Sequence, residues 1–433
     1  MALENPVFDD LMKDYDSNLT HSGVDGERVA RRLYELSHIG YTQAGGVKRP
    51  GFSDEEKTAK TLVKKWMYEA GLEVTEDGAG NVVGRLAGAN SQAKAIGSGS
   101  HVDSVPNGGN FDGPLGVLSA LEVAEAWKAS NYVPQKPYEV IIFTDEEGSR
   151  FNSGLSGSRA MTGDISEEEI AGLRDYNSES LEQVLSHYGS TLQQFKEAKR
   201  DVSALELFVE VHIEQGKKLE KENQPVGIVS GIAGPAWLEA EFVGEAGHAG
   251  NTPMAGRTDP LVAAAEFIQQ IPEFPGKISG TAVATVGKME VFPNGINVIP
   301  EKVVLHADIR DIQEETRDAL LRKIMEEAES IAEKRGTPLT IKQNTKIKPV
   351  PIDQGLQRQL ADSLIKFGIK PTYIPSGAGH DAMILGRHIP VAMLFVRSKG
   401  GISHNPKEWS SLNDCICGIH VLKNFIETKM DEK

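Results

Sequence analysis

The order of apolar and polar positions over residues 53–143 predicts helices and strands in alternation. Apolar residues recur at helical spacing after Ser53, which is predicted to form a capping box with Glu56, and an apolar, β-branched run leads straight into TDEEG. The predicted elements are a helix over 53–70, a hairpin over 73–86, a strand over 95–105, a helix over 115–127 and a strand over 138–143. This alternation indicates an α/β layer with a mostly parallel sheet, in which binding sites gather at the carboxyl ends of the strands.

Two further stretches belong to the same layer. Residues 164–206 are acidic and helical in pattern, which is typical of a surface insertion. Residues 207–216 (LFVEVHIEQG) alternate so that Glu210, His212 and Glu214 share one face, which predicts a half-buried strand with polar groups along one side.

The pattern changes at residue 233 and reads as strand, helix, strand, strand, helix, strand up to residue 345. That βαββαβ order is the signature of a ferredoxin-like domain. We therefore predict a catalytic domain over 1–232 and 346–433 with an inserted domain over 233–345, and hinges at GIAGP (231–235) and KPVP (348–351).

Composition and charge exclude several classes of protein. In 433 residues, 39% are hydrophobic and 25% charged, which argues against a disordered or fibrous chain. The net charge of −16 disfavours nucleic acid and anionic lipid as partners, and apolar runs such as 391–396 are too short to cross a membrane. The acidic N-terminus lacks a signal pattern, so we expect a cytoplasmic protein, and Cys415 and Cys417 suit neither a structural disulfide nor a cysteine zinc site.

The most informative feature is a set of metal-ligand side chains at predicted strand ends. Taken singly, a histidine on a strand or a carboxylate after one is more often structural. The set is stronger, because imidazoles and carboxylates without thiolates suit zinc, manganese or cobalt, and their number fits two ions that share a carboxylate. Its members are His101, Asp103, Asp112, Asp145, Glu146, Glu147, His212 and His404.

Eight segments in order resemble one family. GSHVDSVPNGGNFDGPLG, FTDEEGSRF, FVEVHIEQG, GHAGNTPM, GINVIP, ADIRD, PSGAGHD and GISHNP are similar to the hydantoinase/carbamoylase branch of the dinuclear zinc amidohydrolases. That branch contains N-carbamoyl-L-amino-acid hydrolases, allantoate amidohydrolases and β-ureidopropionases. The resemblance runs from about residue 25 to 425 and leaves the N-terminal 20 residues outside it.

The resemblance implies a metal centre with two divalent ions, zinc or else manganese, cobalt or nickel. Asp112 would bridge both ions, His101 and His212 would complete one, and Glu147 and His404 the other. Asp103 would orient His101, and the alternative for it is a solvated carboxylate at a strand end. Glu146 would be the general base; the residues alone do not separate it from Glu147, and only the resemblance assigns the two roles.

The resemblance also implies groups that act on the substrate. His248 would stabilise an oxyanion, while Asn297 and Arg310 would hold a substrate carboxylate. Members are typically homodimers in which these groups reach the partner's metal site, so the inserted domain would be a lid and dimerisation domain. The alternatives are a turn histidine, an Asx turn and a surface ion pair. Further substrate contacts are expected from Gln215, Ser376, Gly377 and His380, although the PSGAGH loop also suits a tight turn before a helix at Asp381.

These expectations favour an enzyme that removes the carbamoyl group from N-carbamoyl-L-amino acids, giving amino acid, ammonia and carbon dioxide. The nearest alternative is an allantoate amidohydrolase, followed by a β-ureidopropionase or a peptidase-like activity. A two-lobed binding protein without catalysis is a rival of another class, but such proteins tend to lose the base or the ligands, and none is missing here. The glycines at 78, 80 and 84 have the wrong spacing for a dinucleotide fingerprint, which disfavours an oxidoreductase.

Overall fold

The computed structural model describes residues 7–432, which form two compact units. The first comprises residues up to 229 together with 352–374 and those from 380 onward; the second comprises 230–351 and 375–379. The second unit therefore begins and ends a few residues outside the predicted insertion of 233–345, and it takes part of the PSGAGH loop with it.

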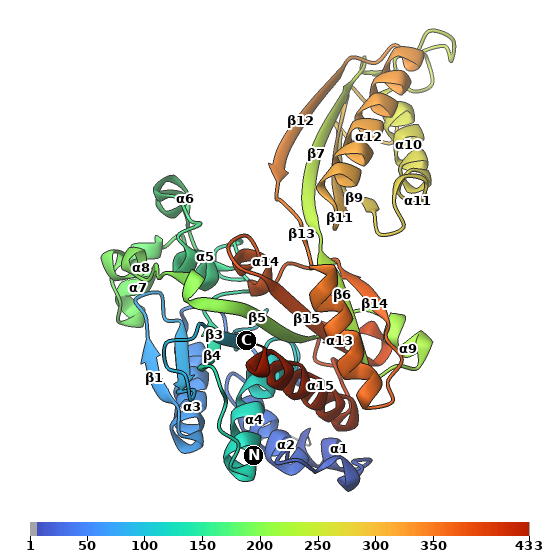
Figure 1. The fold of residues 1–433 in the computed structure, drawn as a ribbon. Coiled ribbons are helices and arrows are strands. Elements are labelled where there is room, and N and C mark those ends of the chain that lie inside the picture. Colours follow the sequence, from blue (N-terminus) through green and yellow to red (C-terminus); the bar gives the residue numbers. More distant parts are fainter. Residues whose placement is uncertain (1–6, 433) are drawn as a thin grey trace. The chain divides into compact units, whose positions relative to one another are not determined.

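The first unit is built on a mixed sheet in the strand order β1-β2-β4-β3-β5-β15-β6, with β14 also on β6 (Figure 1). Its four central strands β4, β3, β5 and β15 are parallel, and the neighbours β2 and β6 run antiparallel to them. The strands are β1 (Glu73–Glu76), β2 (Val82–Leu86), β3 (Ala95–His101), β4 (Tyr138–Phe143), β5 (Leu205–Ile213), β6 (Val226–Ile232), β14 (Tyr373–Ser376) and β15 (Val391–Val396). The predicted α/β class with a largely parallel central sheet is confirmed.

Helices pack against this sheet. α4 (Pro114–Ser130) lies on β3 and β5 and contacts α15 (Leu412–Asp431), while α14 (Asp381–Leu385) contacts β5, β15 and α5 (Ser156–Thr162). Gly116 of α4 is required for this packing, because a Cβ there would lie 2.3 Å from the carbonyl oxygen of Val211. The remaining helices of the unit are α1 (Val7–Met12), α2 (Gly26–Ser37), α3 (Asp54–Ala70), α6 (Glu167–Gly172), α7 (Leu181–Tyr188), α8 (Leu192–Glu197), α9 (Lys218–Glu222) and α13 (Gln354–Lys366), with 3-10 turns at Ser17–Leu19, Val202–Ala204 and Lys399–Gly401.

Two local predictions are wrong in informative ways. β5 is not half-buried, because it lies between β3 and β15 and is buried on both faces along nearly its whole length. Ser53 does cap α3 by accepting the backbone N–H of Glu56, but Glu56 does not complete a capping box. Its carboxylate instead accepts the N–H of Phe52 and pairs with the buried Lys60 at 2.7 Å.

The acidic stretch 164–206 is helical, as predicted, and forms α6, α7 and α8. These helices have a small core of their own, separate from the sheet, in which Leu185 and Phe195 pack with Phe52 and Phe151. Both cysteines lie free on α15, with Cys415 buried.

The second unit is a four-stranded antiparallel sheet in the order β12-β7-β11-β9, with helices α10 and α12 packed on it. Alternate residues of β7 and β11 face these helices and are buried, which builds the core of the unit around Phe242, Phe267 and Leu305. The element order β7, α10, β9, β11, α12, β12 is the predicted βαββαβ order. The elements are β7 (Gly234–Val243), β8 (Gly247–His248), α10 (Pro260–Gln270), a 3-10 turn (Ile271–Glu273), α11 (Pro275–Ile278), β9 (Val283–Phe292), β10 (Val298–Ile299), β11 (Lys302–Asp311), α12 (Glu314–Arg335), β12 (Leu339–Lys346) and β13 (Val350–Pro351).

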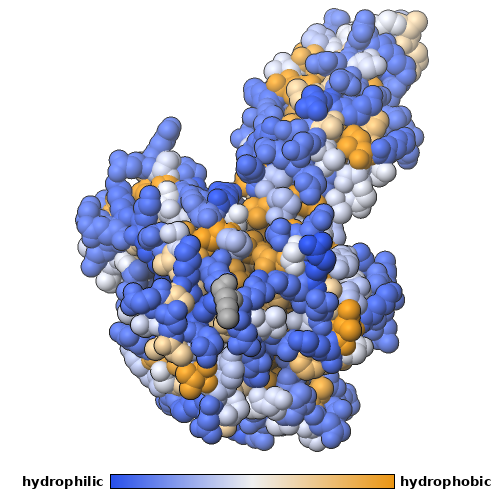
Figure 2. All heavy atoms as spheres, viewed as in Figure 1, coloured by the Kyte–Doolittle hydropathy of each residue, from blue (hydrophilic) through white to orange (hydrophobic). Residues whose placement is uncertain are grey.

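The face in Figure 2 is mostly hydrophilic, with scattered apolar side chains. Among residues 7–432, no helix combines the length and the apolar character that crossing a bilayer requires.

Candidate metal centre

Parallel strands bring the predicted ligands to one edge of the first unit's sheet. His101 is the last residue of β3, Glu146 and Glu147 follow β4, His212 is the penultimate residue of β5, and His404 follows β15. Since these four strands are parallel, their carboxyl ends meet at the same edge, which is where ligands bind in open α/β sheets. Asp112 lies in the loop that immediately precedes α4.

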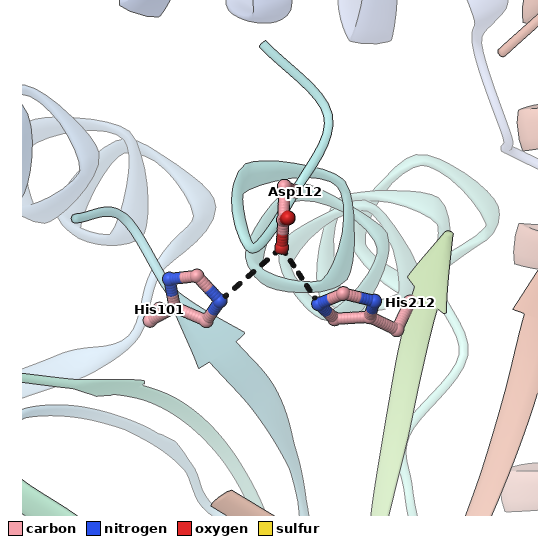
Figure 3. A group of neighbouring side chains, drawn as sticks. All are labelled: His101, Asp112 and His212. Carbon is pink, nitrogen blue, oxygen red and sulfur yellow. Dashed lines mark ion pairs between the residues drawn. The ribbon is translucent and has the colours of Figure 1, made fainter. Parts of the chain in front are cut away.

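His101, Asp112 and His212 form a first group of ligand atoms (Figure 3). Oδ1 of Asp112 lies 3.0 Å from Nε2 of His212 and 3.7 Å from Nε2 of His101. All three side chains are buried, and the two imidazoles come from adjacent strands.

Asp112, Glu147 and His404 form a second group that shares Asp112 with the first. Nε2 of His404 lies 3.3 Å from Oδ2 of Asp112 and 3.2 Å from Oε2 of Glu147. The two oxygens of one carboxylate therefore face different groups. His404 differs from the other ligands because its side chain is 51% exposed and its backbone has a positive φ of 53°.

The separations between these atoms fit divalent cations. A cation bonded at 2.0–2.2 Å to tetrahedrally placed nitrogen and oxygen ligands holds them about 3.4 Å apart, and the separations here run from 3.0 to 3.7 Å. Nε2 of His101 is buried and has no hydrogen-bond partner among the described residues, which is expected of a ligand atom. Two imidazole–carboxylate groups sharing one aspartate thus suit two ions of the zinc, manganese, cobalt or nickel class.

The charges in this cluster perturb one another. Burial alone would lower the pKa of His101, but Glu146 and Asp103 raise it well above its usual value. Hydrogen bonds to Asp112 and Glu147 raise the pKa of His404 to about 11. Burial raises the pKa of Glu146 well above its usual value, and it raises that of Glu147 as well.

Asp103 and Glu146 lie beside the first group. The Asp103 carboxylate accepts the backbone N–H groups of Glu146 and Glu147 at 3.2 and 3.1 Å, and its Oδ1 lies 3.4 Å from Nδ1 of His101. Asp103 thus links the loop after β3 to the loop after β4, and a solvated strand-end carboxylate is excluded because the side chain is fully buried. Oε2 of Glu146 lies 3.7 Å from Nε2 of His101.

Of the predicted substrate contacts in the first unit, Gln215 and His380 lie against the metal-ligand side chains. Nε2 of Gln215 donates to Oδ2 of Asp112 at 2.8 Å. The buried His380 ring packs edge-on against His212, with 4.5 Å between ring centroids, and burial together with His212 lowers its pKa well below the usual value.

The remaining predicted residues lie in the second unit. His248 on β8 is paired in register with Val298 of β10, so His248 and Asn297 are brought together within that unit. Nδ1 of His248 accepts the N–H groups of Gly250 and Asn251 at 3.1 and 3.3 Å, which places the ring proton of the neutral imidazole on Nε2. The exposed His248 ring can therefore donate from Nε2.

Arg310 on β11 is held on two sides. Its Nε and Nη2 form a two-point pair with Asp308 at 2.7 Å each, and Nη1 donates to the Gly377 carbonyl oxygen at 2.6 Å. A guanidinium has five N–H donors, so one remains on each terminal nitrogen. Ser376 also lies in this unit, where its hydroxyl donates to the Ala378 carbonyl oxygen.

Comparison with known proteins identifies the family. The family model described as peptidase family M20/M25/M40 matches residues 97–428. The chain is 44% identical over 403 residues to an N-carbamoyl-L-amino acid amidohydrolase of Geobacillus stearothermophilus, a match covering 93% of this chain and 98% of that one. A crystal structure of an amidase of the hydantoinase/carbamoylase family from Burkholderia multivorans superposes with a TM-score of 0.88 at 34% identity, covering 95% of this chain and 99% of that one. The chain belongs to the M20 family, in its hydantoinase/carbamoylase branch.

This hydantoinase/carbamoylase chain also matches a protein of the alternative activity. It is 37% identical over 392 residues to an allantoate amidohydrolase of Bacillus subtilis, which covers 90% of this chain and 94% of that one. The resemblance seen in the sequence motifs is thus confirmed, and M20 membership agrees with a metal-dependent hydrolase and with the two ligand groups.

Several buried residues that hold the ligand loops of this M20-family chain carry no motif in the sequence. Arg49 donates from its guanidinium to the Val102 carbonyl oxygen at 2.8 Å, behind the His101 loop. Lys60 donates to the Thr144 hydroxyl at 2.7 Å, behind the Glu146 loop. The Glu408 carboxylate accepts the backbone N–H of Asp112 at 3.1 Å. The only signal for Glu408 was its place four residues after His404.

Proposed function

We propose that this protein is a two-metal amidohydrolase that cleaves the carbamoyl group from N-carbamoyl-L-amino acids, giving the amino acid, ammonia and carbon dioxide. The observation that carries the proposal is the shared Asp112, which joins two ligand groups beside the Glu146 carboxylate. The amidohydrolase names of the relatives at 44% and 37% identity support the reaction class.

The proposed roles follow from the positions of the side chains. His101 and His212 would hold one ion, Glu147 and His404 the other, and Asp112 both. When bound, such ions polarise a substrate carbonyl and lower the pKa of water from 15.7 toward ~7. The chain would then need no serine or cysteine nucleophile.

Glu146 is the proposed general base. Its carboxylate lies beside His101 but is outside both groups of ligand atoms, and its backbone N–H is fixed by Asp103. Burial raises the pKa of Glu146, which matches a group that takes a proton from water and passes it to the departing nitrogen.

Substrate recognition is assigned to the second unit. The Nε2–H of His248 would donate to the oxyanion of the tetrahedral intermediate. The two N–H groups left on the terminal nitrogens of Arg310, together with Asn297, would bind the substrate carboxylate. Gln215, Ser376, Gly377 and His380 remain candidates for further contacts with a small carboxylated ureido acid.

A substitution at Glu146 tests the mechanism. Glu146→Gln keeps the size and the polar contacts of the side chain but removes its capacity to accept a proton. We expect a loss of at least 100-fold in kcat with both ions still bound, since general-base catalysis contributes roughly 10²–10⁴. A metal-loaded Glu146→Gln variant with the wild-type rate would overturn the assignment.

Allantoate amidohydrolase is the second candidate, and the Bacillus subtilis relative favours it. Initial rates on N-carbamoyl-methionine, allantoate, N-carbamoyl-β-alanine and an N-acetyl amino acid, each with and without a chelator, separate the alternatives. The proposal expects N-carbamoyl-methionine to be fastest and every rate to be chelator-sensitive. A faster rate on allantoate would move the assignment to the second candidate, and ligand binding without turnover of any substrate would favour a binding protein.

We further propose a homodimer formed through the second unit. β9 is an edge strand of ten residues, bonded to β11 on one side, and it exposes large apolar side chains at Val283, Met289 and Phe292. Long exposed edge strands are usually shielded, and pairing with a second copy would shield this one. Light scattering after size exclusion should give twice the chain mass; a monomer at micromolar concentration would contradict the dimer.

Subunit mixing tests whether His248 acts across that dimer. His248→Ala and Glu146→Gln are each expected to be nearly inactive. If His248 serves the partner's metal centre, an equal mixture of exchanged subunits recovers about one quarter of wild-type activity, because half the dimers are mixed and each has one intact site. No recovery would show that His248 acts within its own subunit. The cytoplasmic location stays a prediction from the sequence.

A further inference from the structure

Glu408 joins two of the three loops that carry ligands of the second group, the Asp112 loop and the His404 loop, although it is not a ligand itself. The residue is buried, with 3% of its surface exposed. Its Oε1 accepts the backbone N–H groups of Phe111 and Asp112 at 2.9 and 3.1 Å. A buried carboxylate thus fixes the backbone of the shared ligand from a position 296 residues further along the chain.

The other oxygen of Glu408 reaches the Asp112 side chain through a serine. Ser403 Oγ lies 2.8 Å from Oε2 of Glu408 and 2.9 Å from Oδ2 of Asp112. Oδ2 is also the Asp112 oxygen that faces His404. Glu408 therefore contacts both the main chain and, through Ser403, the side chain of the residue that the two groups share.

Packing around Glu408 is close. A Cβ on Gly109 would lie 2.2 Å from Oε1 of Glu408, so the loop before Asp112 approaches the carboxylate as only glycine allows. Next to Glu408, Trp409 packs edge-on against the buried Phe111, with ring centroids 5.4 Å apart. The two loops are thus joined by hydrogen bonds and by an aromatic contact.

The second group depends on this junction more than the first. His101 and His212 lie on strands β3 and β5 in the interior of the sheet, which fixes them independently of the loops. His404 lies on an irregular loop, with Gly400 and Gly401 both at positive φ. Glu408, with Ser403, connects the His404 loop to the Asp112 loop and so supports the 3.3 Å separation between Nε2 of His404 and Oδ2 of Asp112.

We propose that Glu408 is a positioning residue for the second metal site, setting the distance between Asp112 and His404 through the Phe111 and Asp112 amides and Ser403. This inference rests on the proposed two-metal centre. Residues that orient metal ligands commonly change metal affinity by about 10–100-fold when they are removed.

The test is a titration of metal-free protein with Co²⁺, in which binding is monitored by calorimetry and by the visible absorption of bound cobalt. The wild type should take up two ions per chain. Glu408→Ala should weaken the second binding step by at least tenfold and the first step, which shares Asp112, by less, and its activity should return at high Co²⁺. Equal second-step affinity in Glu408→Ala and the wild type would overturn the proposal.

Matched variants separate positioning from folding. In Glu408→Gln, the amide oxygen can accept the two backbone N–H groups and the amide nitrogen can donate to Ser403, so we expect the second affinity to be largely rescued. Ser403→Ala removes the side-chain link together with the hydrogen bond that Ser403 Oγ accepts from Gln215 at 3.1 Å, and it should weaken the second step even if Glu408→Ala does not fold. Lys407→Ala, on the exposed neighbour in the same loop, should leave both steps unchanged. A Ser403→Ala variant identical to the wild type would count against the proposal.

The failure of this inference is distinguishable from that of the proposed function. If the wild type, Glu408→Ala and Ser403→Ala all bound two ions per chain with equally high affinity, the role of Glu408 would be contradicted and the two-metal centre would stand. Fewer than two ions in the wild type would contradict the two-metal centre and the role of Glu408 with it.

Discussion

Replacing Gly113 by alanine adds one methyl group beside the proposed metal centre and tests its geometry. Gly113 follows Asp112, has a φ of +84°, and faces the imidazole of His101. A Cβ on this residue would lie 2.5 Å from Cε1 and Nδ1 of His101 and 2.7 Å from Nε2. Gly113→Ala therefore directs its methyl group at a proposed ligand.

The size of the effect follows from two contributions. Gly113 has φ +84° and ψ −61°, outside the left-handed helical region, and an L-residue held in such a sparsely populated conformation costs about 1–3 kcal/mol of backbone energy. Carbon contacts are normally about 3.5–4.0 Å, so the His101 ring must also move by about 1 Å. The ring is fully buried between Asp103, Asp112 and Glu146, so such a shift displaces the first group. A displacement of about 1 Å at a catalytic site can cost 100-fold in rate.

Gly71 provides the matched control. It ends α3 with a φ of +92°, and a Cβ there meets no atom within 4 Å. Gly71 lies in the left-handed region with ψ 18°, so Gly71→Ala carries a positive-φ backbone cost of about 1–2 kcal/mol without the steric contact. We expect Gly71→Ala to keep two ions and at least half of the wild-type kcat/KM, whereas Gly113→Ala loses about 100-fold in kcat/KM and binds the first ion at least tenfold more weakly.

Steady-state hydrolysis of N-carbamoyl-methionine and metal analysis of dialysed protein measure both quantities. If Gly113→Ala held two ions and turned over at the rate of Gly71→Ala, the position of His101 beside Asp112 would not matter for catalysis, and the reasoning would be refuted.

Three further predictions follow from the contacts described. Removing the ions with a chelator should abolish hydrolysis and lower the melting temperature. A ligand that binds only the folded state stabilises it by about 2.7 kcal/mol when its free concentration is 100 times Kd. An unchanged melting temperature would contradict metal binding to the folded protein. Arg310→Lys should raise KM for carboxylated substrates at least tenfold with a smaller change in kcat, because the lysine ammonium lacks the planar fork of N–H groups that pairs with Asp308 and faces a carboxylate at the same time. An unchanged KM would exclude Arg310 from carboxylate binding. Burial and Asp414 raise the pKa of Cys417 to about 11, so alkylation of Cys417 in the native protein should be slow at pH 8 and become faster as the pH approaches 11. The buried Cys415 should react only after unfolding. Rapid alkylation of both cysteines at pH 8 would contradict this packing.

The sequence predicted the elements well where one periodicity dominated. The strands at Tyr138–Phe143 and Lys302–Asp311 begin and end as predicted, since each is an uninterrupted pattern between turn residues. β5 shows the limit of this approach. Its alternation predicted a half-buried strand, but Glu210 and His212 are buried polar groups with partners on neighbouring elements, such as Ser100 and the backbone of Ala382 for Glu210. Periodicity does not distinguish a solvated polar face from a polar site enclosed by other elements.

The grouping of the candidate ligand residues at one sheet edge was predictable, because their types and their places at strand ends were visible together. The contacts that hold these residues in place were not predictable from the sequence, because they join segments that are distant along the chain. Glu56 fits a capping box locally, yet its carboxylate pairs with Lys60 beneath the Glu146 loop. Arg310 was expected to bind a carboxylate or to form an ion pair, and the structure adds that Asp308 occupies one side of its guanidinium.

Diffraction from crystals of the metal-loaded protein, with anomalous data at the absorption edge of the bound metal, tests the central claim most directly. We expect two peaks per chain, one among His101, Asp112 and His212 and the other among Asp112, Glu147 and His404. A single peak, or peaks remote from Asp112, would contradict that claim.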